Sequence, residues 1–76
     1  MKLNKIIEIW FSDSNKSHRD YIEVKNIIEA KEICKKLSIQ GCTCISIDIM
    51  FKDKDGELIE EKSKWYSWKN NKLNKI

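Results

Sequence analysis

Three cysteines and a single histidine are the side chains of this 76-residue chain that could hold a soft metal or carry thiol chemistry. Cys42 and Cys44 stand one residue apart, at the start of a run of alternating isoleucines, and Cys34 precedes them in the chain. A closed zinc site takes four cysteine or histidine ligands, commonly in spaced pairs, and this pattern does not supply them. We interpret the cysteines as small apolar residues and predict no metal and no cofactor.

The elements that carry the cysteines should also keep them apart. In a strand, Cys42 and Cys44 would point to one side, about 7 Å from each other, and that side is opposite to the isoleucines. Cys34 belongs to a predicted helix that packs on the isoleucine side. His18 lies in a distant loop, so the four side chains are not expected to meet.

Two other segments bear a partial likeness to functional sites. The segment "DKDG" (53–56) is similar to part of a calcium loop, but Phe51 and Lys62 then fall where oxygen ligands belong. The second segment combines hydroxyls, a carboxylate and an imidazole in Ser12, Ser14, Ser17, His18, Arg19 and Asp20. A hairpin loop offers neither an oriented base nor an oxyanion hole. We predict that the protein is not an enzyme.

The best-marked element is a helix over residues 27–39. Asn26 is a good N-cap, with Glu29 three residues later as in a capping box. Apolar residues then recur at spacings of three and four, which is one helical face. Gly41 is placed to end the helix in a left-handed conformation. The apolar stripe consists of Ile27, Ala30, Ile33, Cys34 and Leu37.

Four strands are predicted around this helix. Residues 5–12 and 20–25 precede it and are joined by a polar loop, and residues 42–51 and 57–68 follow it. A type I turn over 53–56 with a glycine bulge sets the register of the second hairpin and keeps the isoleucines on one side. The predicted cross-strand pairs include Phe51–Ile59, Ile45–Trp65, Asp48–Lys62 and Cys44–Tyr66.

The predicted fold is therefore an α+β domain over residues 1–68, in the order β-β-α-β-β. A four-stranded, mainly antiparallel sheet carries one helix on one face. Residues 61–76 have a net charge of +4, whereas residues 1–60 have a net charge of −1. Residues 69–76 show no period and are predicted to be a frayed basic tail.

The composition indicates the cellular compartment and the type of genome, but it does not indicate the function. No run of residues is long and apolar enough for a membrane span, and no cleavage site follows the apolar N-terminal stretch, so we expect a cytoplasmic protein with no membrane partner. Lysine, isoleucine and asparagine account for 33 residues. Their codons are A/T-rich, which indicates a low-GC genome, such as a low-GC bacterium or one of its phages or mobile elements.

One helix covers one face of a sheet, so the other face should be open and rich in aromatic residues. Such a patch is typical of an interaction site. The predicted partner-binding residues are Trp10, Tyr21, Met50, Tyr66 and Trp68. Trp10 belongs to this set if Ile7, Ile9 and Phe11 face the helix, and it is otherwise a core residue. We expect a small protein-binding module, for example an inhibitor or adaptor of a larger host machine, whose partner is another protein or a second copy of itself in a homodimer.

The alternative is a domain that binds single-stranded nucleic acid. The segment 62–75 interleaves aromatic residues with lysines, so bases could stack while lysines contact phosphates. This alternative is opposed by four carboxylates that are expected on the same face of the sheet, those of Glu8, Glu23, Asp48 and Glu60. The candidate nucleic-acid residues are Lys62, Lys64, Lys69 and Lys72.

Overall fold

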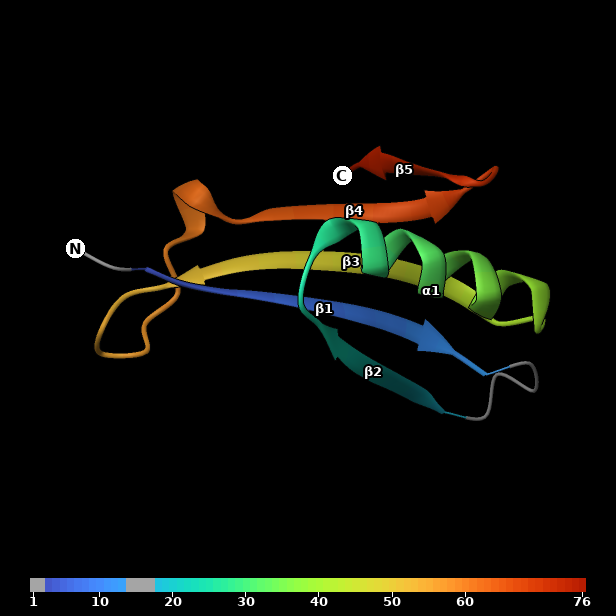
Figure 1. The fold of residues 1–76 in the computed structure, drawn as a ribbon, viewed down its shortest axis with the longest axis horizontal. Coiled ribbons are helices and arrows are strands. Elements are labelled where there is room, and N and C mark those ends of the chain that lie inside the picture. Colours follow the sequence, from blue (N-terminus) through green and yellow to red (C-terminus); the bar gives the residue numbers. More distant parts are fainter. Residues whose placement is uncertain (1–2, 14–17) are drawn as a thin grey trace.

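The computed structural model describes residues 3–13 and 18–76, in which one α-helix lies on one face of an antiparallel sheet of five strands (Figure 1). The elements are β1 (Asn4–Ser12), β2 (Arg19–Val24), α1 (Ile27–Ile39), β3 (Thr43–Lys52), the 3-10 helix η1 (Glu60–Lys62), β4 (Lys64–Lys69) and β5 (Lys72–Lys75). The strand order is β2-β1-β3-β4-β5. The predicted α+β class with a helix on one face is confirmed, and the sheet has five strands instead of four.

Helix α1 has the predicted bounds because both of its caps are local. The side chain of Asn26 accepts a hydrogen bond of 2.8 Å from the backbone amide of Glu29. At the other end Gly41 has φ +90°, which lets the amide of Cys42 donate to the carbonyl of Leu37 at 3.0 Å. Both helix ends therefore have partners for backbone groups that the helix itself leaves free.

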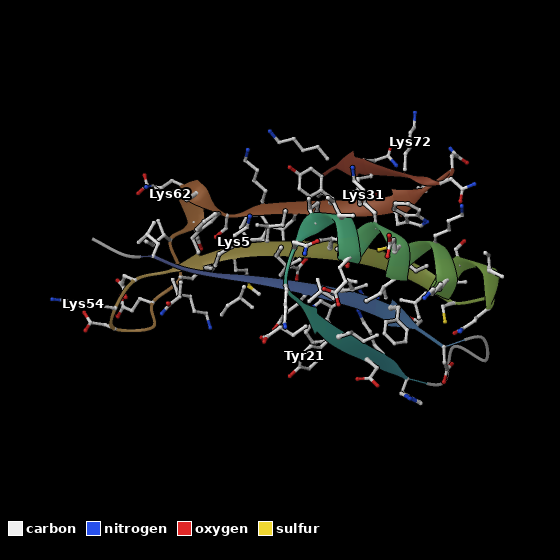
Figure 2. The ribbon with its side chains drawn as sticks, viewed as in Figure 1. Lys5, Tyr21, Lys31, Lys54, Lys62 and Lys72 are labelled. Atoms are coloured by element: carbon white, nitrogen blue, oxygen red, sulfur yellow. The ribbon has the colours of Figure 1, made fainter. Side chains whose placement is uncertain are left out.

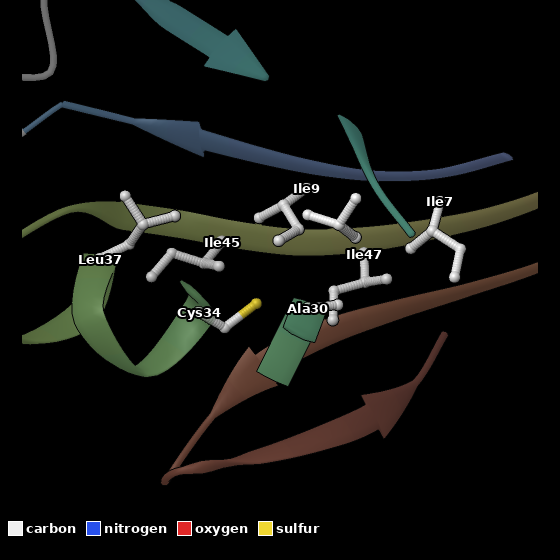
Figure 3. Close-up of a cluster of buried hydrophobic side chains, with 8 residues drawn as sticks. Ile7, Ile9, Ala30, Cys34, Leu37, Ile45 and Ile47 are labelled. Atoms are coloured by element: carbon white, nitrogen blue, oxygen red, sulfur yellow. The ribbon is translucent and has the colours of Figure 1, made fainter. Parts of the chain in front are cut away.

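The core lies between α1 and the central strands. β1 pairs with β3 so that Ile7 faces Ile49 and Ile9 faces Ile47 across the strands. β2 and β3 both run antiparallel to β1, and α1 crosses over β1 to connect them. Figure 3 shows the resulting cluster, which consists of Ile7, Ile9, Val24, Ala30, Cys34, Leu37, Ile45 and Ile47.

The hairpin between β3 and β4 follows the predicted register only near its turn. Lys52 bridges to Leu58, and the amide of Ile59 donates to the carbonyl of Phe51 at 2.8 Å. The chain then leaves the strand and forms η1. Ser63, which is buried, closes this turn: its hydroxyl donates to Ile59 at 2.9 Å and accepts from the amide of Phe51 at 3.1 Å.

The three residues of η1 shift all later pairing by three. The observed pairs are Ile49–Lys64, Asp48–Trp65, Ile47–Tyr66 and Ser46–Ser67, so the predicted Ile45–Trp65, Asp48–Lys62 and Cys44–Tyr66 pairs are wrong. Because three is odd, the shift exchanges the two faces of β4. Tyr66 and Trp68 lie on the helix side, where Trp68 packs against the core, and Trp65 lies on the opposite face.

A second irregularity reverses the faces at the start of β3. Cys44 and Ile45 together oppose Phe11 of β1, which is a β-bulge, and Cys44 adopts φ +53°. Cys42 consequently packs against the core, whereas Cys44 is exposed. The prediction that both cysteines point away from the helix is therefore wrong for Cys42.

The C-terminal segment, predicted to be frayed over 69–76, contains the edge strand β5. Asn70 and Asn71 have φ +55° and +61°, as a two-residue turn of type I′ requires, and Lys69 and Lys72 pair across it. Asparagine tolerates the left-handed conformation better than most residues. The pair of asparagines was thus a hairpin signal.

Replacement of Ile47 by aspartate should unfold the domain. Ile47 is 0% exposed, so an aspartate there would bury an unpaired charge at a cost of several kcal/mol. We expect loss of the cooperative thermal transition measured by circular dichroism. Ile28→Asp is the control, because Ile28 is 70% exposed on α1. A cooperative transition of Ile47→Asp within a few degrees of wild type would contradict the assigned core.

Candidate functional site

The face of the sheet opposite to α1 has no other described element packed on it (Figure 1). Side chains alternate along each strand, so the register of the core strands defines which residues lie there. None of them is buried. We call this surface the open face; its central residues are Ile6, Glu8, Trp10, Tyr21, Glu23, Ser46, Asp48, Met50, Trp65 and Ser67. Arg19 of β2 and Lys52 of β3 lie on the same face, toward its two ends.

Three carboxylates form a line across the middle of the open face. Glu23, Glu8 and Asp48 occupy directly opposite positions on the adjacent strands β2, β1 and β3, and Trp65 of β4 comes next in the line. We call the three carboxylates the acidic row. Neighbouring strands lie about 4.8 Å apart, and like charges placed opposite each other destabilise a sheet. Among the described residues, no lysine or arginine forms an ion pair with the row.

A stacked aromatic pair lies beside the acidic row. The rings of Trp10 and Tyr21 have centroids 4.7 Å apart and an interplanar angle of 24°. The indole nitrogen of Trp10 donates to Oε1 of Glu8 at 3.1 Å, which holds the indole against the sheet. Tyr21 remains 50% exposed. The pair therefore presents a preformed apolar surface to the solvent.

Arg19 is the basic residue that reaches over this region. Its guanidinium donates to the carbonyl of Cys44 at 3.1 Å and to the hydroxyl of Ser46 at 3.2 Å. Burial and the neighbouring carboxylate of Glu8 raise the pKa of Asp48 above its usual value, and Arg19 opposes this rise. The net effect is that ionised Asp48 is disfavoured where it lies.

The predicted partner-binding residues divide between the two faces. Tyr21 and Met50 lie on the open face as predicted, and so does Trp10, whose side of the first strand the sequence left open. Tyr66 and Trp68 are instead on the helix side. Sequence reasoning missed Trp65, which takes their place. The sequence did hold a signal that the predicted register was wrong. That register placed the polar residues Glu61 and Ser63 opposite Ile49 and Ile47, on the face that packs against the helix.

The candidate nucleic-acid lysines do not form one surface. Lys62 belongs to η1, Lys64 shares the helix side with Tyr66, and Lys69 and Lys72 flank the β4–β5 turn. Figure 2 shows Lys62 and Lys72 far apart along the molecule. The interleaved sequence pattern thus becomes a dispersed set of exposed cations.

A shallow depression continues the open face at the end of the sheet that carries η1. It has a volume of about 810 Å³ and is lined by Leu58, Ile59, Glu60, Glu61 and Trp65. Trp65 therefore borders both the acidic row, where it pairs with Asp48, and a depression that is lined by two further carboxylates. The apolar and acidic character of the open face extends into this depression.

The cysteines and the histidine considered for metal chemistry come from three parts of the chain: Cys34 from α1, Cys42 and Cys44 from around the start of β3, and His18 from the residue before β2. No group of three potential ligands that could hold a metal occurs among residues 3–13 and 18–76. His18 lies 3.3 Å from Asp13 at the surface. Ser14 and Ser17 fall outside the described residues. Cys34 is buried in the core, and burial raises the pKa of its thiol to about 11, which leaves it protonated at neutral pH.

Comparison of the chain with protein-family models, with curated proteins and with solved structures finds no match to any of them. Within the described part of the chain, no helix has the length and apolar character needed to cross a membrane. The chemistry of the open face is therefore the basis for the function proposed below.

Substitution of Asp48 by asparagine should stabilise the protein at neutral pH. The raised pKa of Asp48 means that the native state binds this proton more readily than the unfolded chain does. Ionised Asp48 therefore costs stability above both pKa values, and the cost disappears below about pH 3.9, the usual pKa of aspartate. Urea unfolding of Asp48→Asn and wild type between pH 3 and 7 should show an advantage that grows with pH. Glu57→Gln, in the exposed β3–β4 loop, is the control, and an advantage that instead grows toward pH 3 would contradict the assignment.

Thiol labelling should distinguish the cysteines. In the native protein Cys44 should react readily with a thiol reagent such as dithionitrobenzoate, because it is exposed. Cys34 should react only as fast as the protein opens, because it is buried and its thiol pKa is raised to about 11. Single-cysteine variants followed by absorbance separate the two rates. Equal rates would show that Cys34 is not in the core.

Proposed function

We propose that the protein is a small non-enzymatic module that binds another protein through its open face. The observation that carries this proposal is the uncovered sheet surface bearing a stacked tryptophan–tyrosine pair. Trp10 and Tyr21 lie together at one side of the face, and Met50 and Trp65 extend the apolar surface across it. Apolar side chains on an uncovered surface are typical of interaction sites, and tryptophan and tyrosine are enriched among residues that dominate binding energy.

The size of the open face suits a protein partner. The five strands are four to ten residues long and about 4.8 Å apart, so they span a flat area of roughly 550 Å², before the relief of the side chains is counted. A standard protein interface buries about 800 Å² on each partner. A partner that covered the whole face would thus form an interface of ordinary size.

The charge of the open face favours protein over nucleic acid. A polynucleotide would have to bring phosphates over the acidic row, and the lysines that could attract it are dispersed. Coulomb repulsion near a protein surface amounts to about 4 kcal/mol for two unit charges 4 Å apart. We therefore do not propose nucleic-acid binding on this face.

The double variant Trp10→Ala with Tyr21→Ala should lose the natural partner. Truncation of two aromatic residues at the centre of a contact commonly costs more than about 2 kcal/mol, which is roughly thirtyfold in affinity. Affinity capture of the tagged protein from its native host, after nuclease treatment, measures the effect. The matched control is Ile28→Ala with Ile39→Ala, which removes two exposed apolar side chains from α1.

Thermal melting of both variants establishes that they fold. A partner that survives nuclease and is lost from the aromatic variant alone supports the proposal. A folded aromatic variant that retains every nuclease-resistant partner would contradict it, as would capture that depends entirely on nucleic acid.

A further inference from the structure

We propose that the partner presents lysine or arginine side chains, set among apolar ones, to the acidic row of the open face. This inference rests on the proposed function and specifies the chemistry of the protein that binds. The occupant is a basic, amphipathic protein segment. A second copy of this chain and a nucleic acid are the competing occupants.

The acidic row is a set of three carboxylates that form no ion pair with a lysine or arginine of the described residues. Glu8 and Asp48 lie opposite each other on β1 and β3, and Glu23 adds a third carboxylate on β2. Arg19 donates to the carbonyl of Cys44 and to the hydroxyl of Ser46, and its charge offsets only part of the rise in the pKa of Asp48. A cation from a partner, placed over Glu8 and Asp48, would satisfy both carboxylates and relieve their repulsion.

The aromatic residues around the row suit the same ligand. Trp65 lies directly opposite Asp48, and Trp10 is held by its hydrogen bond to Glu8. Lysine and arginine side chains pack their aliphatic stems and cationic heads favourably against tryptophan. On the far side of Trp65, the depression at η1 adds the carboxylates of Glu60 and Glu61. A basic segment could therefore continue from the row into this depression.

The position of the row opposes a symmetric dimer through this face. Glu8 and Asp48 lie near the middle of their strands, and β1 and β3 are interior strands of the sheet. A two-fold axis through the centre of the face would bring the row of one copy onto the row of the other. Four or more carboxylates would then meet with no cations between them. The charge that attracts a basic partner thus disfavours self-association.

Binding of designed peptides tests this inference. The probes are a synthetic peptide that alternates leucine with arginine, its analogue with glutamate in place of arginine, and oligothymidylate. The proteins are wild type, Glu8→Gln with Asp48→Asn, and Trp10→Ala with Tyr21→Ala. Nuclear magnetic resonance titration of the backbone amides gives the affinity and the location, and light scattering gives the oligomeric state.

We expect the arginine peptide to bind wild type saturably and to shift amides of the open face. The Glu8→Gln/Asp48→Asn variant should bind it at least roughly tenfold more weakly, which is the effect of losing a charge-assisted hydrogen bond. Equal binding by that variant, equal binding of the glutamate peptide, or no saturable binding up to about 1 mM would overturn the inference. Oligothymidylate bound on the open face, or a wild-type dimer that the aromatic substitutions dissociate, would overturn it as well.

The aromatic variant separates this inference from the proposed function. If the aromatic substitutions abolish capture of the natural partner while Glu8→Gln/Asp48→Asn leaves capture intact, the open face binds a protein but not through basic side chains. If neither variant affects capture, the proposed function fails together with the inference.

Discussion

The pairing of β1 with β3 is the constraint on which the rest of the structure depends. It places Ile7 and Ile9 opposite Ile49 and Ile47, and so forms the apolar strip that α1 covers. A 13-residue helix is about 20 Å long, whereas a ten-residue strand is about 33 Å long. A chain of 76 residues has one such helix in its described part, so it covers part of one face and leaves the other open. The open face is thus uncovered because the one α-helix of the described residues packs on the opposite face.

Elements with local signals could be predicted from the sequence. The bounds of α1 follow from Asn26 and Gly41, which act on their immediate neighbours. The turn after β3 was also predictable, because Gly56 and the residues beside it determine the first pairs of the hairpin. Tyr21 was placed on the correct face because residues 20–25 alternate regularly. The face of Trp10 was left open, because apolar residues are adjacent in residues 5–12.

Elements that depend on irregularities could not be predicted in the same way. η1 removes three residues from the strand, and a hydrogen-bonded side chain, Ser63, stabilises it. Hydrophobic periodicity does not reveal that three residues leave the strand. The residues after η1, Trp65, Tyr66 and Trp68, were therefore assigned to the wrong faces. The bulge at Cys44 had the same effect on Cys42. The sequence also did not predict that the carboxylates form a row, because Glu8 and Asp48 become neighbours only through the non-local pairing of β1 and β3.

The acidic row is costly for a domain of this size, whose total stability is on the order of 5–15 kcal/mol. Charges on edge strands protect a sheet from pairing with other chains, and this accounts for Glu23 on β2 and for the lysines of β5. It does not account for Glu8 and Asp48, whose strands are interior and have no free edge. Like charges on the open face oppose the association of two such faces, which matters for a surface that also bears Trp10 and Trp65. The same carboxylates can be neutralised by a basic partner, so repulsion between copies and attraction of a partner arise from one arrangement. If the proposed basic partner binds here, the acidic row would contribute to specificity in two ways, by repelling a second copy and by attracting the partner.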